Sequence, residues 1–492
     1  MRPKITRRKF LQATAGGAAL AALGSTLGCD PDPSARATAA SSPVGQTWSF
    51  RSRPDLRPPV ITVTRPPGDI APGLVFVAPK NGPDEAHPSQ DGCVILDDEG
   101  QPVWLHLLAD ESLDVMNFKL QEYKGETVLT WWVGRHTGFG QGECVICDHS
   151  YREIKRVRAG NGYQADHHEF LITPEDTALI TIYHGVKRDL TSVGGPADAT
   201  VLDGIVQEVD IETGEVLFEW HSLDHVELSA HESGFYDHLH LNSIDLYDEN
   251  HLLVSSRTTS TVFKISRKTG EIVWRLGGEK SDFDMGPGAR FFYQHDARSH
   301  PAGIITLFDN GSENTAEQSR GAVIGIDEDA MKATLVREYT YPDKLLSATQ
   351  GNVQVLPNGN VFIGWGSSPV ISEFSQDDNI QFDAEFPTES ETYRAFRFPW
   401  KGYPKYAPAI AAESAGQDDE VKIYASWNGA TEVATWQVLA GEGPRKLKEL
   451  ASTPREGFET VITVKTTEPY VSARAIDASG KVLGSSRAIR PQ

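Results

Sequence analysis

Short runs of alternating hydrophobic and polar residues fill most of the chain, and they recur as one repeating unit. In each unit an apolar run is followed by a second run, a polar turn and a closing run that often ends in an aromatic residue. Alternating runs bounded by Gly, Asn and Asp predict short β-strands. The first run of the unit occurs at residues 127–131, 177–181, 251–255, 303–307 and 359–363.

Units of about four strands that repeat in this way predict the blades of a β-propeller. A further copy at residues 73–107 lacks its first strand, and an unassigned strand lies at residues 393–398. Because an isolated blade cannot bury both of its faces, we expect these two segments to share one sheet and close a ring. The prediction is a six-bladed β-propeller; a stack of unrelated β-sandwiches is the alternative, which the regular repeat disfavours.

The pattern changes after about residue 407. Shorter alternating strands are predicted at residues 421–427, 433–436, 458–461 and 471–475. They are typical of a small β-sandwich of the immunoglobulin or fibronectin type. The segment contains neither His nor Cys, so we assign it no chemistry. We therefore predict an all-β chain with a propeller over residues 47–403 and a sandwich over residues 404–492.

The N-terminal segment is interpreted as an export signal. Arg7 and Arg8 precede a mildly apolar run at residues 10–27, which is typical of a twin-arginine export signal. The run contains too much Gly, Ala and Thr for a transmembrane anchor. We predict a signal peptide over residues 1–28 and export to the periplasm or cell surface.

Cys29 follows this run as in a bacterial lipoprotein cleavage site, and the next residues are rich in Pro, Ala and Ser. We predict that Cys29 is lipidated, that residues 29–46 form a tether, and that this lipid is the only membrane attachment. An ordinary signal with an incidental cysteine is the alternative. The other cysteines, Cys93, Cys144 and Cys147, are expected in the core, because the Cys-x-x-Cys spacing lies in an apolar strand and not before a helix; a pairing among them is left open.

The charge balance excludes one class of partner. The chain has 46 Lys and Arg against 68 Asp and Glu, a formal net charge of −22. Nucleic-acid binding requires a basic surface, so no nucleic-acid partner is expected.

Histidines gather at one level of the predicted ring. The first strand of a blade lines the central channel, and in three blades a His lies at the start of this strand. The residues at this level are His167, His168, His238, His240, Asn242 and His295. Residues two apart on a strand face the same way, so His238, His240 and Asn242 are expected to share a face. Arg257 ends the neighbouring strand and could reach the same place.

Three interpretations of this cluster compete. The histidines could cap blade ends, they could bind a metal, or they could bind an anion. A guanidinium beside the imidazoles would repel a metal cation, whereas Arg and His donors suit a tetrahedral oxyanion such as sulfate or phosphate. No metal and no cofactor is expected.

The sequence resembles the arylsulfotransferase family, whose secreted bacterial and fungal members are six-bladed propellers. The resemblance extends from about Thr47 to Trp400. It is carried by residues 50–59, 166–170, 177–179, 240–243, 255–257, 294–297 and 308–311. The chain lacks the large N-terminal domain of the enterobacterial enzymes and has no cysteine pair near His295 to match their disulfide.

The resemblance implies a function and a set of site residues. The expected reaction transfers a sulfuryl group from an aryl sulfate to a phenol, without a nucleotide donor. His295 matches the histidine that the family sulfates transiently. The family's other sulfuryl-contacting residues match His168, His240, Asn242 and Arg257. Of these, we expect His168, His240 and Arg257 to be catalytic and to hold the sulfuryl oxygens, while one of the two imidazoles protonates the leaving phenolate. We expect Asn242 to bind the substrate, and His167 and Arg298 are further candidate substrate-binding residues. A non-catalytic surface propeller that binds an anionic ligand, and an aryl sulfate hydrolase, are the alternatives.

Overall fold

The computed structural model describes residues 46–81, 89–228, 235–312, 315–387, 390–414 and 419–492. In these ranges nearly all regular structure is β-strand, and helix is limited to α2 (Ser222–His225) and a 3₁₀ turn (Thr191–Val193). The prediction of an all-β chain is therefore confirmed. None of the helices in these ranges has the length and apolar character needed to cross a bilayer. The predicted signal peptide and Cys29 lie outside the described residues.

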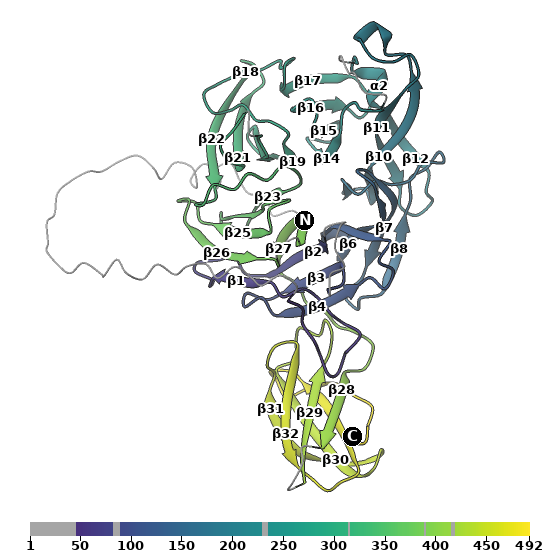
Figure 1. Ribbon diagram of the computed structural model, residues 1–492, viewed down its shortest axis with the longest axis vertical. Coiled ribbons are helices and arrows are strands. Elements are labelled where there is room, and N and C mark those ends of the chain that lie inside the picture. The colour runs from purple at the N-terminus through teal and green to yellow at the C-terminus, as the bar shows by residue number, and fades with distance from the viewer. Residues whose placement is uncertain (1–45, 82–88, 229–234, 313–314, 388–389, 415–418) are drawn as a thin grey trace, which may run out of the picture.

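Six antiparallel sheets of four or five strands make up the larger part of the molecule (Figure 1). Sheet 1 contains β27 (Ser390–Phe398), β2 (Leu74–Asn81), β3 (Gly92–Leu96) and β4 (Pro102–Leu107). Sheet 2 contains β5 (Asp114–Tyr123), β6 (Glu126–His136), β7 (Gly140–Cys147) and β8 (Glu153–Val157). Sheet 3 contains β9 (Phe170–Ile172), β10 (Thr177–Arg188), β11 (Ala199–Asp210) and β12 (Val216–His221), with β13 (Phe235–Asp237) parallel to β11.

The remaining three sheets follow in chain order. Sheet 4 contains β14 (Leu241–Leu246), β15 (His251–Ser256), β16 (Thr261–Ser266) and β17 (Ile272–Gly277). Sheet 5 contains β19 (His295–His300), β20 (Ile304–Asp309), β21 (Arg320–Asp327) and β22 (Lys332–Thr340), with β18 (Asp284–Met285) parallel to β22. Sheet 6 contains β23 (Asn352–Val355), β24 (Val361–Gly364), β25 (Val370–Phe374), β26 (Ile380–Glu385) and β1 (Thr62–Arg65).

The six sheets contact one another in a closed, β-propeller-like cycle, which we call the ring. The innermost strands touch in the order β27, β5, β9, β14, β19 and β23, and the first and last of these strands are again in contact. A separate hydrophobic cluster fills each of the six interfaces between neighbouring sheets. Each sheet therefore buries both of its faces, which one sheet alone could not do.

The two ends of the ring segment meet in sheet 1. Strand β27 pairs with β2 in antiparallel register, with Leu74 opposite Phe398 and Val77 opposite Ala395. The predicted pairing of residues 393–398 with residues 73–77 is therefore confirmed. Strand β1 makes a second link, because it adds to the outer edge of sheet 6.

The predicted placement of the cysteines in the core is also confirmed. Cys93 and Cys147 belong to the hydrophobic cluster between sheets 1 and 2, and Cys144 belongs to the cluster between sheets 2 and 3. All three are buried, unpaired thiols. Burial raises the pKa of the Cys93 thiol well above its usual value, so this side chain behaves as a small apolar residue.

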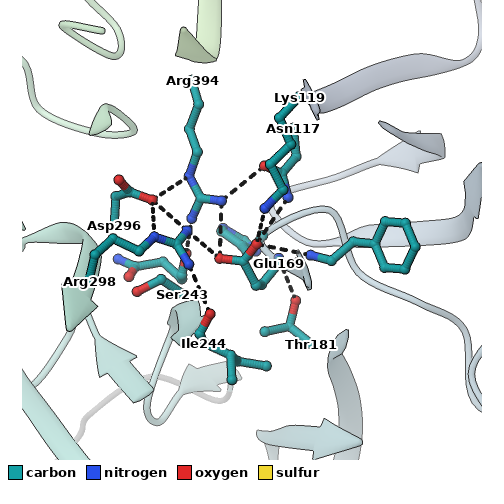
Figure 2. Close-up of polar contacts among 12 residues, drawn as sticks. Asn117, Lys119, Glu169, Thr181, Ser243, Ile244, Asp296, Arg298 and Arg394 are labelled. Atoms are coloured by element: carbon teal, nitrogen blue, oxygen red, sulfur yellow. Dashed lines mark hydrogen bonds and ion pairs between the residues drawn. The ribbon is translucent and has the colours of Figure 1, made fainter. Parts of the chain in front are cut away.

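A buried ion network fills the centre of the ring (Figure 2). The Glu169 carboxylate contacts Lys119 Nζ at 2.7 Å, Arg298 Nη2 at 2.5 Å and Arg394 Nη1 at 3.1 Å. Asp296 Oδ1 contacts both guanidinium groups, at 2.5 Å and 3.1 Å. Burial alone would raise the pKa of Glu169, but the three cations hold it well below its usual value. Each of these charges therefore has a partner of opposite sign in the buried interior, as a buried ion requires.

The C-terminal strands form two further sheets, which Figure 1 shows beyond β4 and which we call the C-terminal module. One sheet contains β28 (Ala409–Ser414), β29 (Glu420–Ser426) and β32 (Glu459–Lys465); the other contains β31 (Lys446–Pro454), β30 (Thr435–Gly443), β33 (Tyr470–Ile476) and β34 (Val482–Ser485). Both sheets contribute to one core, in which Ile423 and Ile462 meet Trp436, Val438 and Val471.

The module is attached to the open edge of sheet 1. The Asn428 side chain accepts a hydrogen bond from the Leu105 N–H and donates one to the Leu105 carbonyl, both at 2.8 Å. The Gly429 N–H donates to the Val103 carbonyl at 2.8 Å. The turn at Asn428 thus forms hydrogen bonds with the free edge of β4, as a neighbouring strand would. It thereby covers a sheet edge that would otherwise be exposed.

Candidate active site

Three histidines from three different sheets lie close enough together to influence one another electrostatically. His168 lies two residues before β9, His240 directly precedes β14, and His295 begins β19. The ring centres of His168 and His240 are 4.8 Å apart. His168 and His295 are buried, whereas 17% of the His240 side chain is exposed, so solvent reaches the cluster at His240.

Irregular backbone brings these side chains to one level. The pairing of β14 with β15 shifts between Leu241 and Ser243, and the pairing of β19 with β20 shifts between His295 and Arg298. Asp296 has a φ of 57°, in the left-handed region. Such bulges redirect side chains and are common beside active sites. Here the bulge lets His295 join the histidines while Asp296 enters the ion network.

Carboxylates hold the Nδ1 atoms of two of the histidines. His168 Nδ1 lies 2.5 Å from Asp166 Oδ1, and His240 Nδ1 lies 2.5 Å from Asp237 Oδ2. A carboxylate is an acceptor, so the proton of a neutral imidazole stays on Nδ1 and Nε2 keeps its lone pair. Burial alone would raise the pKa of Asp237, but the hydrogen bond to His240 lowers it.

An amide fixes the third histidine in the same tautomer. His295 Nδ1 lies 2.7 Å from Asn310 Oδ1. The Asn310 Nδ2 group donates to the carbonyls of Ser347 and Gln350, so the oxygen of this amide must be the atom that faces His295. His295 therefore donates from Nδ1, and its Nε2 is the nucleophilic nitrogen. The Gln350 N–H points at this Nε2 from 3.2 Å.

Arg257 lies beside His295 because both bind the same turn. Arg257 Nη2 donates to the Ala348 carbonyl at 3.0 Å, two residues before Gln350. The Arg257 N–H donates to the His240 carbonyl at 3.0 Å. The guanidinium also lies 5.2 Å from the ring centre of Tyr293, and its Nε is buried without a hydrogen-bond partner among the described residues. Arg257 therefore keeps an unused donor next to the histidines.

Electrostatics keep two of the histidines neutral. Burial lowers the pKa of His295 well below its usual value, and the charges of His240, Arg257 and His168 lower it further, against the opposing effect of Asn310. Burial also lowers the pKa of His168 to about 3. At neutral pH both imidazoles carry lone pairs at Nε2 and no net charge, as a nucleophile or a base requires.

The other predicted residues have different positions. Asn242 lies fully buried below the histidines, and its Nδ2 donates to the Gln294 carbonyl at 2.6 Å. His167 packs against His168, with ring centres 3.9 Å apart. His238 does not share the face of His240; its Nε2 lies 3.1 Å from the Val226 carbonyl.

Arg298 is placed away from the histidines. Its Nε and Nη2 bind Asp296, Nη2 also binds Glu169, and Nη1 donates to the Ile244 carbonyl at 2.9 Å. The expectation that Arg298 contacts the substrate is therefore not supported by its position. Pattern alone placed Arg298 on the right strand, but the bulge at Asp296 turns its side chain into the ion network.

The residues that orient the histidines were not among the predicted site residues. Asp166 directly precedes the His167–His168 pair, and Asp237 lies three residues before His240. Asn310 lies in residues 308–311, which carried part of the resemblance. Their short spacing from a His, or their place in a matched stretch, was the available signal. Gln350 offered none, because its contribution comes from the backbone.

The cluster of Asp166, His167 and His168 also has the composition of a metal site, with ligand atoms within 4.8 Å of one another. The carboxylate is already committed to hydrogen bonds. Asp166 Oδ1 accepts from His168 and Thr181, and Oδ2 accepts from the Gly140 N–H. Among the described residues, the Asp166 carboxylate therefore serves to orient His168.

Comparisons with known proteins identify the family. The sequence profile of the arylsulfotransferase (ASST) family matches residues 119–387, which is more than half of the 492 residues. No curated protein matches the chain.

Several solved structures have distant similarity. A protein of unknown function from Bacteroides caccae aligns with 14% identity and a TM-score of 0.42, over 66% of this chain and 98% of its own. A streptogramin B lyase aligns with 10% identity and a TM-score of 0.35, over 74% and 94%. The β-propeller domain of Cps50 (Swd1) from Myceliophteria thermophila aligns with 10% identity and a TM-score of 0.22, over 58% and 82%. These likenesses are too weak to support an argument.

The family match includes all three histidines and Arg257, and it covers five of the six inner strands of the ring except for the first residues of β5. The chain therefore belongs to the arylsulfotransferase family.

Proposed function

We propose that the protein transfers a sulfuryl group from an aryl sulfate to a phenol through a covalent intermediate on His295. The observation that carries the proposal is the fixed tautomer of this residue. Asn310 holds the proton on Nδ1, and burial keeps the ring neutral, so Nε2 carries a lone pair near Arg257, to which the Gln350 N–H donates in the unreacted enzyme. A neutral imidazole beside a guanidinium is the combination that nucleophilic attack on a sulfate ester needs.

In the first half-reaction, His295 Nε2 forms a bond to sulfur while the bond between sulfur and the aryl oxygen breaks. The electron pair of the broken bond goes to the leaving phenolate. The free Nε–H of Arg257 and the Gln350 N–H are the donors for the sulfuryl oxygens. Because the Gln350 N–H faces Nε2 in the unreacted enzyme, it would turn to an oxygen of the sulfuryl group once Nε2 is bonded to sulfur.

We assign proton transfer to and from the phenolic oxygen to His240, which Asp237 orients. His240 is the most exposed of the three histidines, and the Asp237 carboxylate holds its Nδ1 atom. Protonated His240 gives the leaving phenolate a proton, and neutral His240 accepts one from the incoming phenol. This phenol then attacks sulfur, the bond to His295 Nε2 breaks, and the electron pair returns to the imidazole.

The proposed role of His168 differs from the first expectation. With its proton on Nδ1 and a pKa of about 3, His168 has no N–H at Nε2 to donate to a sulfuryl oxygen. Its Nε2 can instead accept a hydrogen bond from the hydroxyl of the incoming phenol, whose proton passes to His240. Asn242 and His167 then act by supporting the backbone and the ring of their neighbours.

We further propose that the ring is a six-bladed β-propeller over residues 47–403 and that the C-terminal module is a β-sandwich over residues 404–492. The closed cycle of inner strands supports the first, and the shared core of the two C-terminal sheets supports the second. Export by the twin-arginine route with a lipid anchor at Cys29 completes the proposal, on the basis of the sequence alone.

The test uses 4-nitrophenyl sulfate as donor, with and without added phenol. Transfer predicts that phenol accelerates 4-nitrophenolate release and that phenyl sulfate forms. Donor alone should add one sulfuryl group to a peptide that contains His295, measured by mass spectrometry. His295→Ala should lower turnover by about 10³-fold or more.

The matched control is His251→Ala. Like His240, His251 has an aspartate three residues earlier, Asp248, with an Nδ1 contact to it of 2.8 Å, but it lies at the end of β15 opposite to Arg257. Normal turnover in this variant together with a loss in His295→Ala supports the proposal. Release that does not respond to phenol would identify a hydrolase, and no release with retained binding of the donor would identify a binding module.

A further inference from the structure

Tyr393 lies beneath the histidines although it comes from the far end of the ring segment. It is carried by β27, the strand that closes sheet 1, and only 1% of the residue is exposed. Its ring centre is 5.3 Å from that of His167 and 5.7 Å from that of His168, both nearly perpendicular. The ring therefore forms the floor on which the His167–His168 pair rests.

The hydroxyl of Tyr393 connects two sheets at the level of the site. It lies 3.3 Å from the carbonyl oxygen of His168 and 3.1 Å from that of Asn242, and it can donate to either. Both acceptors are main-chain atoms, one at the end of sheet 3 and one in the bulge of β14. The Tyr393 hydroxyl thus sets the distance between the backbone segments that carry His168 and His240.

The main chain of Tyr393 reaches a third element of the site. Its carbonyl accepts a hydrogen bond from the Gly351 N–H at 3.1 Å. Gly351 follows Gln350, whose N–H faces His295, and it ends the turn to which Arg257 is bound. Tyr393 is therefore hydrogen-bonded to three backbone segments. These segments position the nucleophile His295, the guanidinium of Arg257 and the two flanking histidines.

We infer that Tyr393 is a positioning residue for sulfuryl transfer, because its hydroxyl and main chain fix the spacing of the segments that carry His168, His240 and Gln350. The inference rests on the proposed function of the same site. Catalysis by several groups on one sulfuryl group depends strongly on their mutual placement, so a small error in spacing is costly. The active site is then complete only when the closing strand is in place.

The Tyr393 side chain suits this role chemically. Burial raises the pKa of the Tyr393 hydroxyl, so it remains a donor throughout the working pH range. Arg394 also donates to the Asn242 carbonyl, at 2.9 Å, but its charge belongs to the ion network. Removing Arg394 would therefore unbalance buried charges, whereas removing only the Tyr393 hydroxyl leaves packing and charge unchanged.

The experiment compares Tyr393→Phe with Tyr341→Phe. Tyr341 is a half-buried tyrosine whose hydroxyl donates to Asp383 at 3.0 Å, between sheets 5 and 6 and away from the histidines. Each variant loses one hydroxyl. We expect Tyr393→Phe to lower kcat roughly tenfold with less than a twofold change in KM for the donor, while its urea midpoint stays close to that of Tyr341→Phe. Tyr341→Phe should keep wild-type kcat.

A second readout does not depend on activity. In protein labelled with ¹³C at histidine Cε1, the resonances of His168 and His240, assigned by substitution of each, should shift in Tyr393→Phe and remain in place in Tyr341→Phe. Unchanged histidine shifts together with unchanged kcat in Tyr393→Phe would overturn the inference. If the wild type fails to form sulfohistidine, the proposed function fails, and the histidine shifts alone still decide whether Tyr393 sets the geometry.

Discussion

At the scale of single residues, three side-chain oxygens determine where the protons of the histidines lie. Asp166, Asp237 and Asn310 each accept from an Nδ1 atom and leave Nε2 as the reactive nitrogen. Only His295 has an amide as its partner. A neutral partner stabilises an imidazolium less than a carboxylate does, so burial is sufficient to keep His295 uncharged.

Asn310→Ala should therefore damage transfer without removing a group that touches the substrate. The substitution frees the tautomer of His295 and releases the turn that carries Gln350. We expect kcat to fall roughly 10²-fold, in the range seen when an orienting or oxyanion-binding group is lost. The control is Asn360→Ala, because Asn360 also donates two hydrogen bonds but lies at the far end of sheet 6. A loss of equal size in both variants would contradict the assignment.

Reactivity of His295 should persist in acid. An ordinary histidine, with a pKa near 6.5, would be about 3% neutral at pH 5. Burial holds the pKa of His295 well below that value, so protonation should not remove the nucleophile between pH 7 and pH 5. In a single turnover with 4-nitrophenyl sulfate, whose phenolate leaves without help, the rate of His295 sulfation should change less than threefold over this range. A fall of about 20-fold would mean that His295 titrates as an exposed histidine does.

At the scale of the elements, sequence periodicity predicts the strands well. The five repeated apolar runs all lie in second strands of their sheets, β6, β10, β15, β20 and β24. The pairing of residues 393–398 with residues 73–77 followed from counting strands, because an unpaired strand needs a partner. The bulges at Asn242 and Asp296 could not be predicted in this way, since a period of two assumes regular pairing.

The same limitation explains which site residues were placed correctly. His168, His240 and His295 sit at strand starts, which the repeat locates. Arg298 lies beyond a bulge, so its side chain follows a direction that the period does not give. Contacts made by main-chain atoms, such as that of Gln350, leave no mark in a sequence at all.

The attachment of the C-terminal module gives a prediction at this scale. Asn428 alone satisfies the N–H and the carbonyl of Leu105 at the open edge of sheet 1. Asn428→Ala should lower the free energy of unfolding by about 1–3 kcal/mol, the cost of leaving buried backbone groups without partners. Lys446→Ala, which removes an exposed ion pair with Glu442 in the same module, should cost less than about 0.5 kcal/mol. Urea unfolding measures both, and equal midpoints would refute the edge-capping role.

At the scale of the whole molecule, charge is arranged in two layers. The formal net charge is −22, yet the centre of the ring holds Lys119, Arg298 and Arg394 against two carboxylates. The acidic exterior keeps the protein away from polyanions.

Export remains a prediction from the sequence, and it can be tested on the intact chain. Replacing both Arg7 and Arg8 by Lys should leave precursor in the cytoplasm, because the export receptor recognises the guanidinium pair. Cys29→Ala should move the exported protein from the membrane fraction to the soluble fraction, measured by cell fractionation. Membrane association that persists in the Cys29 variant would remove the lipid anchor but leave export intact.

The closing strand has a consequence for the order of events during synthesis. A ribosome releases the chain from its N-terminus, and β2 waits for β27, which is made more than three hundred residues later. Until that strand emerges, neither Tyr393 nor Arg394 is present to join the segments of the site. We therefore expect nascent chains and products of premature termination before residue 398 to be inactive. Activity therefore requires a chain that extends through β27. A proteolytic cut that releases β27 should inactivate the enzyme although it removes no group that contacts the substrate.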